Sequence, residues 1–429
     1  MKNNVKNLIE FIDHCPSCFH VIENARKQFL EHGFMELKEK EYWDLEEGKS
    51  YFVTRNGSSI IAFHLPKKDF QGFHIVASHS DSPTYRIKEQ PEMSVEKHYT
   101  KLNIERYGGM IPETWFDRPL SVAGRIIIEE NGQIKDQLVN IDRDLMIIPN
   151  LAIHMSRSSN ESKQLNPQKD LLPLCGGNLT KDGFEEMIAK ESGVEKEDIL
   201  SYDLFLYNRM RGTTLGINEE FVAAPKLDDL ECAYSSIEGM LNAKLSEDYV
   251  TVCAVFDNEE VGSGTKQGAG STFFPEVLKR ISYLCGKNEE EYYMAVADSF
   301  MLSADNAHAV HPNYQDKTDP TNRPYINEGI VLKYNASQKY TTDANSAALV
   351  KYLCKKEKIK CQVFFNRSDM LGGSTLGNIL TGQVSIKAAD IGLPQLSMHS
   401  TYETAGCKDL DDMIILMESF YELGKEVQI

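Results

Sequence analysis

The sequence predicts an α/β protein with more than one domain, and three observations support this fold class. Strand-like and helix-like segments alternate over residues 225–423, which is typical of a mostly parallel sheet covered by helices on both faces. Strand-like runs dominate residues 85–220, where helical periodicity is scarce. The length of 429 residues also exceeds that of one compact core. We therefore expect a three-layer domain with a mostly parallel central sheet and an additional β-rich domain.

The N-terminal part predicts two helices followed by three strands. Helical periodicity over residues 4–32 is interrupted at Pro16, where a proline would break a continuous helix. Strands are expected at Ser50–Val53, Ser59–Phe63 and Phe73–Ser78. The last of these strands leads directly into the polar segment His79-Ser80-Asp81.

The β-rich middle of the chain contains one strong hairpin signal. Val122–Glu130 and Gln133–Val139 are joined by Asn131-Gly132, a pair that two-residue hairpin turns favour. Helical periodicity is clear only over Lys181–Lys190. Tyr107-Gly108-Gly109 also lies in this part and indicates no chemistry by itself.

The C-terminal part alternates between helices and strands. Helices are expected at Asp228–Ala243, Pro275–Leu284, Ala344–Lys356 and Asp409–Leu423, and strands at Val250–Phe256, Tyr293–Ala297, Gly329–Lys333 and Cys361–Phe365. Val384–Ala388 is also strand-like, and Gly392-Leu393-Pro394 predicts a turn after it.

The charge balance excludes some classes of partner. The 46 Lys and Arg residues oppose 64 Asp and Glu residues, a net charge of −18, so we expect no basic face for nucleic acid or anionic lipid. No run approaches the ~18 apolar residues of a membrane-spanning helix. Met1–Asp13 mixes charged and apolar residues, unlike a signal peptide, and the nine cysteines are scattered. We therefore expect a cytoplasmic protein with reduced thiols.

Histidines and acids follow several of the predicted strands. In open α/β sheets, ligands bind beyond the carboxyl ends of the strands. The residues at such positions are His79, Asp81, Glu259, Glu260, Asp298, Asp305 and His399. In the His79/Asp81 pair, the carboxylate could accept the second ring N–H of the imidazole and so fix its tautomer. A hydrogen-bonded surface histidine is the alternative, because this pattern is weak alone.

Two pairs of adjacent acids have equally open interpretations. In Glu259-Glu260, one glutamate could ligate a metal ion while the other takes a proton from water whose pKa the ion lowers. A solvated loop is the alternative. Asp228, in Asp228-Asp229, could bridge two metal ions with its two oxygens, or simply complement a helix dipole.

The combination of these residues favours a two-metal hydrolase. Two histidines and four or five carboxylates on separate loops around one sheet suit one bridging aspartate and one histidine on each ion. Other chemistries fit less well. Gly262–Gly268 lacks the G-x-x-x-x-G-K-[ST] spacing of a phosphate-binding loop, and the chain contains no G-x-S-x-G motif of a serine hydrolase.

Six short segments hold most of these candidate residues. They are Ala77-Ser78-His79-Ser80-Asp81-Ser82-Pro83, Thr114-Trp115-Phe116-Asp117-Arg118-Pro119-Leu120, Lys226-Leu227-Asp228-Asp229-Leu230, Asp257-Asn258-Glu259-Glu260-Val261-Gly262-Ser263, Ser303–Asn313 and Met398-His399-Ser400. In this order they resemble the M18 metallopeptidases, the aspartyl aminopeptidase family. The resemblance runs from about residue 5 to residue 425, and the segments are specific only in combination.

The resemblance implies a co-catalytic pair of zinc ions, with manganese or cobalt as alternatives. The implied ligands are His79, Asp228 and Asp305 for one ion, and Asp228, Glu260 and His399 for the other. The resemblance also implies that Asp81 orients His79. Glu259 is the implied general base, which activates water and later protonates the leaving amine.

The resemblance extends to residues that contact the substrate. Lys333 is similar to a family lysine that pairs with an acidic side chain at the N-terminal residue of the substrate. Tyr340 and His308 stand where the family contacts its substrate. His154 resembles a histidine that reaches into the site of a neighbouring subunit, where it could stabilise an oxyanion.

The resemblance also implies a domain organisation and an assembly. Residues 1–84 and 221–429 would form a discontinuous catalytic domain, and residues 85–220 an inserted dimerisation domain. The insertion agrees with the ligand positions, because Asp81 and Asp228 must converge although no assigned ligand lies between them. Dimers of the family build a dodecamer, so we expect a homo-oligomer whose closed shell admits peptides.

The expected function is therefore removal of N-terminal Asp or Glu from peptides by a di-zinc aminopeptidase. An aminopeptidase of broader or neutral specificity and a non-catalytic assembly protein of the same fold are the alternatives. Two residues depart from the family pattern: Asp229 stands where Asn is usual, and Asn378 where Pro is usual. The extra charge of Asp229 could alter metal affinity.

Overall fold

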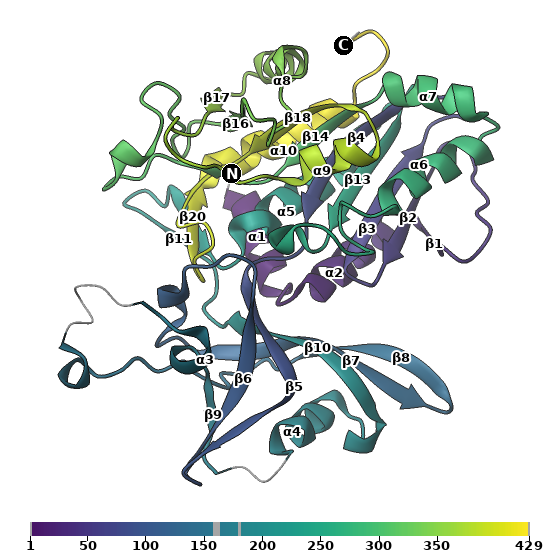
Figure 1. The fold of residues 1–429 in the computed structure, drawn as a ribbon. Helices are drawn as coiled ribbons and strands as arrows, with labels where there is room; N and C mark the ends of the chain where they lie inside the picture. The colour runs from purple at the N-terminus through teal and green to yellow at the C-terminus, as the bar shows by residue number, and fades with distance from the viewer. Residues whose placement is uncertain (1, 158–163, 179–181, 428–429) are drawn as a thin grey trace.

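The computed structural model describes residues 2–157, 164–178 and 182–427. The chain has a mixed α/β fold with three sheets, of nine, six and five strands. In Figure 1 the nine-stranded sheet and its helices lie above, and the six-stranded sheet lies below. No helix in the described ranges is long and apolar enough to cross a membrane.

The nine-stranded sheet has the order β1-β2-β3-β13-β4-β14-β18-β16-β17. Its strands are β1 (Met35–Leu37), β2 (Lys49–Arg55), β3 (Ser59–Leu65), β4 (Phe73–His79), β13 (Val250–Phe256), β14 (Phe300–Ala304), β16 (Ile330–Lys333), β17 (Cys361–Phe364) and β18 (Lys387–Gly392). The four central strands β13, β4, β14 and β18 run parallel. Antiparallel pairing occurs at β2–β3, β3–β13 and β18–β16, so the sheet as a whole is mixed.

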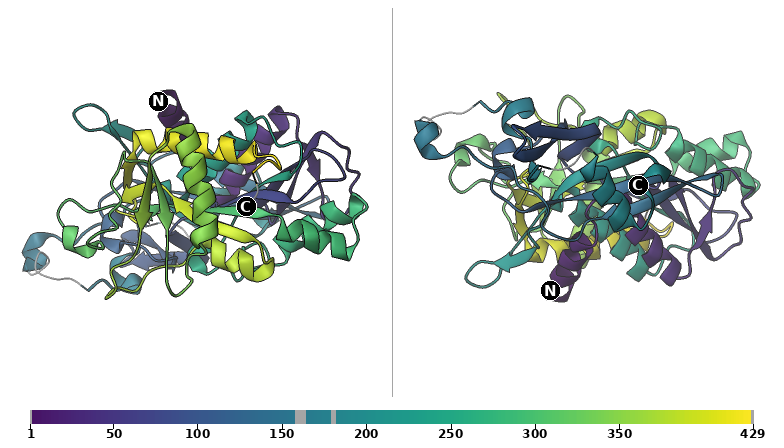
Figure 2. Two further views of the ribbon diagram at one scale, coloured as in Figure 1. Left: turned by 90° about the horizontal axis from the view of Figure 1, so that it is seen from above. Right: turned by 90° about the horizontal axis from the view of Figure 1, so that it is seen from below.

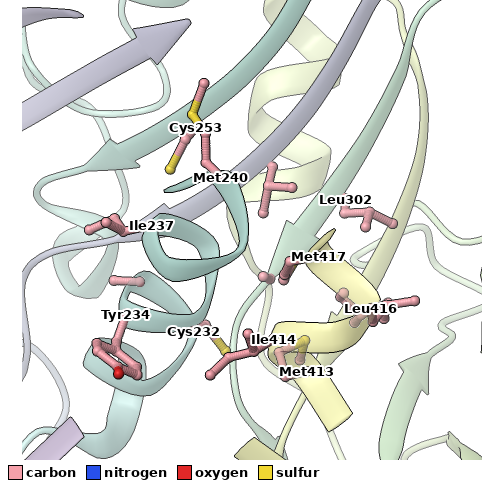
Figure 3. Close-up of a cluster of buried hydrophobic side chains, with 14 of the residues drawn as sticks. Cys232, Tyr234, Ile237, Met240, Cys253, Leu302, Met413, Ile414, Leu416 and Met417 are labelled. Carbon is pink, nitrogen blue, oxygen red and sulfur yellow. The ribbon is translucent and has the colours of Figure 1, made fainter. Parts of the chain in front are cut away.

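The core is divided into two apolar clusters by this sheet. Because side chains alternate along a strand, Val76 of β4 faces one cluster while Ile75 and Ala77 face the other. The first cluster includes side chains of α1, α2, α5, α8 and α10, and the second those of α6, α7 and α9. Helices therefore cover both faces of the sheet. Figure 3 shows part of the first cluster, where α5 and α10 pack side by side.

The helices that the sequence predicts are present, whereas α3 and α9 were not predicted and α7 was predicted as a strand. Their bounds are α1 (Lys2–Asp13), α2 (Cys18–Glu31), α3 (Pro167–Asp170), α4 (Gly183–Ser192), α5 (Leu227–Asn242), α6 (Phe273–Leu284), α7 (Glu289–Ala297), α8 (Ala344–Glu357), α9 (Leu376–Gln383) and α10 (Cys407–Tyr421). Short 3₁₀ turns are η1 (Pro112–Trp115), η2 (Ile153–Met155), η4 (Lys196–Asp198), η5 (Glu259–Val261) and η6 (Gln315–Lys317). Lys181, the expected start of one helix, lies outside the described residues, and α4 begins at Gly183.

The strand predicted at Tyr293–Ala297 is wrong, because this segment is the end of helix α7. Asn288 caps the helix and forms a capping box with Glu291, and three glutamates in the first turn complement the helix dipole. The apolar run alone could not distinguish a short helix from a strand. The strand begins later, at β14, so Asp298 is the C-cap of α7.

The turn predicted at Gly392-Leu393-Pro394 is also wrong. Strand β18 continues to Gly392, and β19 (Pro394–Leu396) follows after a single residue. β19 belongs to the five-stranded sheet β11-β12-β20-β19-β15, with β11 (Thr213–Leu215), β12 (Phe221–Ala224), β20 (Glu403–Gly406) and β15 (Ala307–His308). The chain therefore passes from one sheet to the next at Gly392–Pro394 without reversing.

The six-stranded sheet is antiparallel throughout, with the order β8-β7-β10-β5-β6-β9. Its strands are β5 (Thr84–Val95), β6 (Tyr99–Tyr107), β7 (Leu120–Glu130), β8 (Gln133–Asn140), β9 (Leu174–Gly176) and β10 (Ile199–Asn208). The predicted hairpin is present, and Asn131 and Gly132 both have positive φ, at 55° and 76°. The sheet packs around a third apolar cluster of its own. Figure 2 gives two further views of its position beneath the nine-stranded sheet.

Candidate metal centre

Neighbouring strand ends bring four of the candidate residues to one edge of the nine-stranded sheet. His79 is the last residue of β4, and it pairs in register with Phe256, the last residue of β13. The turn η5, which carries Glu259 and Glu260, follows β13 directly, and Asp305 follows β14. Because β13, β4 and β14 are parallel neighbours, these side chains gather at the carboxyl ends of the strands.

Asp228 lies at the centre of this group. It is the second residue of α5, and its two carboxylate oxygens face two different imidazoles. Its Oδ1 lies 3.5 Å from Nε2 of His79, and its Oδ2 lies 3.3 Å from Nε2 of His399. The Oε2 atom of Glu260 lies 3.5 Å from the same His399 nitrogen. The structure thus brings all five predicted ligands together, with Asp228 between the two histidines.

The donor atoms form three groups that could hold a metal ion. The groups are His79, Asp228, Asp229 and Asp305; His79, Glu259 and Glu260; and Asp228, Glu260 and His399. Within each group the donor atoms lie within 4.8 Å of one another. Imidazole nitrogens and carboxylate oxygens are the ligands of catalytic zinc sites.

Several of these oxygens are buried without a hydrogen-bond donor. Within the described ranges, Oδ1 of Asp228, Oδ1 of Asp229 and Oε1 of Glu260 have no hydrogen-bond partner. A buried carboxylate oxygen without a partner is costly, because its charge is removed from water. A bound cation would satisfy these atoms, so the residues present fit a metal centre.

In the metal-free cluster, the buried acids and imidazoles shift one another's pKa values. The pKa of Glu259 is raised to about 8, chiefly by burial and also by Asp305 and Asp81, while His79 opposes the shift. Burial likewise raises the pKa of Glu260, and the neighbouring Asp228 adds to this effect. The pKa of Asp228 is lowered despite its burial, because both imidazoles stabilise its carboxylate. Asp228 is therefore the acid most favoured to be ionised here.

Asp81 is buried and organises the turn that carries the two glutamates. Its carboxylate accepts hydrogen bonds from the backbone N–H groups of Glu259 and Glu260, each at 3.1 Å. Nδ1 of His79 lies 3.0 Å from the backbone oxygen of Asp81 and 3.5 Å from its carboxylate Oδ1. The predicted contact between Asp81 and the His79 ring is thus made mainly by the backbone carbonyl.

Glu403 was not predicted from the sequence, and Asp229 was noted there only as a departure from the family pattern. Glu403 is buried, and its carboxylate accepts hydrogen bonds from the backbone N–H groups of Asp228 (3.0 Å) and His399 (2.7 Å). Asp229 is fully buried, accepts a hydrogen bond from the backbone N–H of His79 and lies within ligand range. Glu403 is the first residue of the short strand β20, and no local pattern in the sequence distinguishes it from a surface acid.

A cavity of about 180 Å³ adjoins the cluster and is lined by three predicted substrate contacts, Lys333, Tyr340 and His308. Lys333 is buried at the end of β16, where its Nζ lies 2.7 Å from the backbone oxygen of Asp305 and 3.2 Å from its carboxylate. The Lys333 ammonium also lies 5.2 Å from the centre of the Tyr340 ring. Among the described lining residues, Lys333 is the only lysine or arginine.

His154 lies away from this cavity. It is exposed in the short turn η2, and it is not among the residues that line the cavity of its own chain. The placement of His154 in the site of a neighbouring subunit stays a prediction.

Residues 11–421 match the family model described as "Aminopeptidase I zinc metalloprotease (M18)". A protein of Clostridium acetobutylicum named "Probable M18 family aminopeptidase 2" is 46% identical, over 99% of this chain and all of that protein. A protein of the same name from Pseudomonas aeruginosa is 37% identical, over 97% of both chains.

Solved structures of similar chains share the fold. The structure titled "Cryo-EM structure of the Ape4 and Nbr1 complex" matches with a TM-score of 0.95 and 37% identity, over 98% of this chain and 85% of that one. A dodecamer of mApe1 from S. cerevisiae matches with a TM-score of 0.86 and 27% identity, over 98% and 97% of the chains. An M18 aminopeptidase of Thermotoga maritima matches in fold, with a TM-score of 0.88 and 22% identity, over 98% and 97%.

Proposed function

The chain belongs to the M18 family of aminopeptidases, and on this premise we propose that it is a di-zinc aminopeptidase that removes acidic N-terminal residues from peptides. The observation that carries this proposal is the shared Asp228. Its two oxygens face His79 and His399, and each imidazole belongs to a separate group of potential metal ligands.

Two ions would be held by residues that this chain provides. His79, Asp228 and Asp305 would hold one ion, and Asp228, Glu260 and His399 the other. Zinc is favoured by the family description and by the mixture of imidazole and carboxylate ligands, while manganese and cobalt accept similar ligands. When bound, such ions supply Lewis acidity, which lowers the pKa of water and polarises the peptide carbonyl.

Glu259 is the proposed general base. Its half-buried carboxylate lines the cavity beside the ligand groups. In the metal-free protein the pKa of Glu259 is raised to about 8, first by burial. Bound cations would lower this value, so that the carboxylate can accept a proton near neutral pH. Glu259 would then take a proton from the attacking water and return it to the amine that leaves.

The acidic preference rests on Lys333. A buried ammonium group at the wall of the cavity would pair with the carboxylate of an N-terminal Asp or Glu side chain. Tyr340 and His308 line the same cavity and would contact the substrate beside it.

One observation favours broader specificity instead. The Lys333 ammonium already contacts the carboxylate and the backbone oxygen of Asp305, so its charge is partly satisfied within the chain. Replacement Lys333→Ala separates the two alternatives. We expect a fall of at least tenfold in kcat/KM for Asp and Glu substrates and little change for Leu substrates. An unchanged ratio of Asp to Leu hydrolysis would support the broader enzyme.

The assembly and domain organisation form part of the proposal. We infer that residues 85–220 are an inserted dimerisation domain, that residues 1–84 and 221–429 form the catalytic domain, and that dimers build a cytoplasmic dodecamer. The similar mApe1 chain from S. cerevisiae is described as a dodecamer. In such an assembly His154 would reach the cavity of a neighbouring subunit. Mass measurement in solution tests the subunit number.

The deciding experiment compares hydrolysis of Asp-, Glu-, Leu- and Lys-nitroanilides after the protein has been loaded with zinc, manganese or cobalt. Metal analysis of the purified protein accompanies the assay. We expect two ions per subunit and the highest kcat/KM for Asp or Glu. Faster hydrolysis of Leu would refute the acidic preference, and fewer than two ions would refute the two-metal site.

A further inference from the structure

The segment Tyr107-Gly108-Gly109 runs directly past the candidate metal centre. Tyr107 is the last residue of β6 in the six-stranded sheet, and the chain then leaves that sheet for η1. The three residues contact three different members of the metal centre, although they lie far from all of them in the sequence. None of the three is a potential metal ligand.

Tyr107 contacts Asp81 and the turn that carries the glutamates. Its hydroxyl donates a 2.7 Å hydrogen bond to Oδ2 of Asp81 and accepts one of 2.8 Å from the side chain of Asn258. The same Oδ2 atom accepts the backbone N–H of Glu260. Removal of the Tyr107 hydroxyl would therefore loosen both Asp81 and the residue that precedes Glu259.

Gly108 packs against Glu260. Its φ of +77° is a conformation that residues with a side chain rarely adopt. A Cβ atom at this position would lie 3.1 Å from Cβ of Glu260 and 3.4 Å from its backbone oxygen. Only glycine therefore leaves room at this position for Glu260 to stay in the ligand group, because any side chain would press against it.

Gly109 and Ile111 hold His399. Because Nε2 of His399 faces Asp228 and Glu260, the other ring nitrogen, Nδ1, is directed toward Gly109. Nδ1 lies 3.8 Å from the position that a Cβ atom of Gly109 would occupy, so the ring packs beside this backbone. The backbone N–H of Ile111 donates a 3.0 Å hydrogen bond to the backbone oxygen of His399. These contacts restrict the backbone of His399 and the space into which its ring can turn, and so favour the orientation in which Nε2 faces Asp228 and Glu260.

We propose that Tyr107-Gly108-Gly109 is a positioning segment by which the six-stranded sheet holds Asp81, Glu260 and His399 in the geometry that metal binding requires. The proposal rests on the proposed function, because it assumes that these residues serve a metal centre. It extends that function by assigning the alignment of the site to residues of the second sheet. Partners of metal ligands typically change metal affinity or activity by roughly 10- to 100-fold when they are removed.

The first test replaces Tyr107 by Phe in the full-length protein, with Tyr85→Phe as the matched control. Tyr85 is fully buried in the adjacent strand β5, and its hydroxyl has no hydrogen-bond partner in the described part of the chain. Zn²⁺ dissociation constants are measured by competition with a chelator, and the absorption spectrum of the Co²⁺-loaded protein reports ligand geometry. For Tyr107→Phe we expect at least tenfold weaker binding of one ion, an altered Co²⁺ spectrum and a kcat lowered at least tenfold with KM within about threefold.

The second test replaces Gly108 by Ala, with Gly132→Ala as the control. Gly132 has nearly the same φ, +76°, but a Cβ atom there would meet no atom within 4 Å. The two variants therefore share the backbone strain and differ in the contact with Glu260. We expect weaker Zn²⁺ binding for Gly108→Ala only. Should Gly108→Ala fail to fold, the conservative Tyr107 variant decides the question.

The outcomes separate this inference from the proposed function. The inference would be overturned, and the proposed function would stand, if the wild type binds metal and is active while Tyr107→Phe keeps its Zn²⁺ dissociation constants and kcat within twofold of the wild-type values. Equal losses in Tyr107→Phe and Tyr85→Phe would also overturn it, because they would indicate general loosening of the sheet. Failure of the wild type to bind ions would refute the proposed function, and the inference with it.

Discussion

Asp228 illustrates how single residues determine the chemistry of this protein. Its position near the start of α5 lets each carboxylate oxygen face one imidazole, one from β4 and one from the loop before β20. Glu403 holds the backbone at Asp228 and at His399, so both are fixed by the same carboxylate. The structure brings together the candidate ligands that the sequence indicated. Glu403 was not predicted, because its contact with the backbone of Asp228 joins residues 175 positions apart in the chain.

Replacement of Glu259 by Gln should lower kcat by at least ~100-fold, because an amide cannot accept the proton from water. Zinc content and subunit number should stay at the wild-type values, as measured by metal analysis and light scattering. Glu260→Gln is the adjacent control, which should lose one zinc ion. Glu259 also lies within ligand range. Loss of zinc from Glu259→Gln would therefore indicate that Glu259 is a metal ligand. Retained activity would show that Glu259 is not the general base.

His74 should make the protein less stable in acid. It is buried in β4 and stacked on Tyr249, and burial lowers its pKa to about 3. The unfolded chain takes up the proton near pH 6.5, so stability is fully present above that pH and is lost as the pH falls toward 3. This loss amounts to about 1.4 kcal/mol per pH unit.

Chemical denaturation from pH 7 to pH 4 tests this prediction. In His74→Phe the free energy of unfolding should depend less steeply on pH, by about 1.4 kcal/mol per unit below pH 6.5. The exposed His98 provides the control, because folding leaves its ring in water. Equal slopes for wild type and His74→Phe would contradict the prediction.

At the scale of elements, strand ends and sheet crossings position the site. The hairpin at Asn131-Gly132 was predicted correctly, because its turn chemistry is local. The helix α7 was predicted as a strand, because its apolar residues are few and its identity depends on the capping at Asn288. The crossing at Gly392 was predicted as a turn, because glycine and proline often mark turns. Here Gly392, which has no side chain, allows strand β18 to pass close to the backbone of Asp305, directly after β14.

Gly392→Ala should disturb both the crossing and the metal centre. A Cβ atom at this position would lie 2.1 Å from the backbone oxygen of Asp305, so strand β18 or the Asp305 backbone must shift. We expect a loss of at least ~2 kcal/mol in unfolding free energy and weaker zinc binding. In Gly382→Ala, the added Cβ meets no atom within 4 Å. This control should keep wild-type zinc binding and lose no stability, because alanine favours the helix α9 by up to about 1 kcal/mol. Wild-type stability and zinc affinity in Gly392→Ala would contradict this account.

At the scale of the whole molecule, all three sheets contribute residues to one site, with Glu403 coming from the five-stranded sheet. The nine-stranded sheet supplies the strand ends, and the six-stranded sheet supplies Tyr107, Gly108 and Gly109 beside them. The net charge of −18 should repel acidic peptides at long range. Selection of an acidic N-terminus would therefore depend on cations within the cavity.

This charge predicts an unusual salt dependence. Added salt should leave kcat/KM for Asp-nitroanilide unchanged or raise it slightly, because it screens the long-range repulsion more than the buried contacts. The measurement compares about 0.05 M and 0.5 M salt, with Leu-nitroanilide as the uncharged reference. A steep decrease specific to the Asp substrate would contradict the prediction.

The sequence by itself determined the family resemblance, most helices and strands, and the identity of the candidate ligands. These features depend on periodicity, turn chemistry and short segments, which are local properties of the chain. Only the tertiary structure decided that Glu403 holds Asp228, that Lys333 contacts Asp305, and that Tyr107 bonds Asp81. Each of these contacts joins residues distant in sequence, so it depends on the order in which strands pack, which local patterns do not encode.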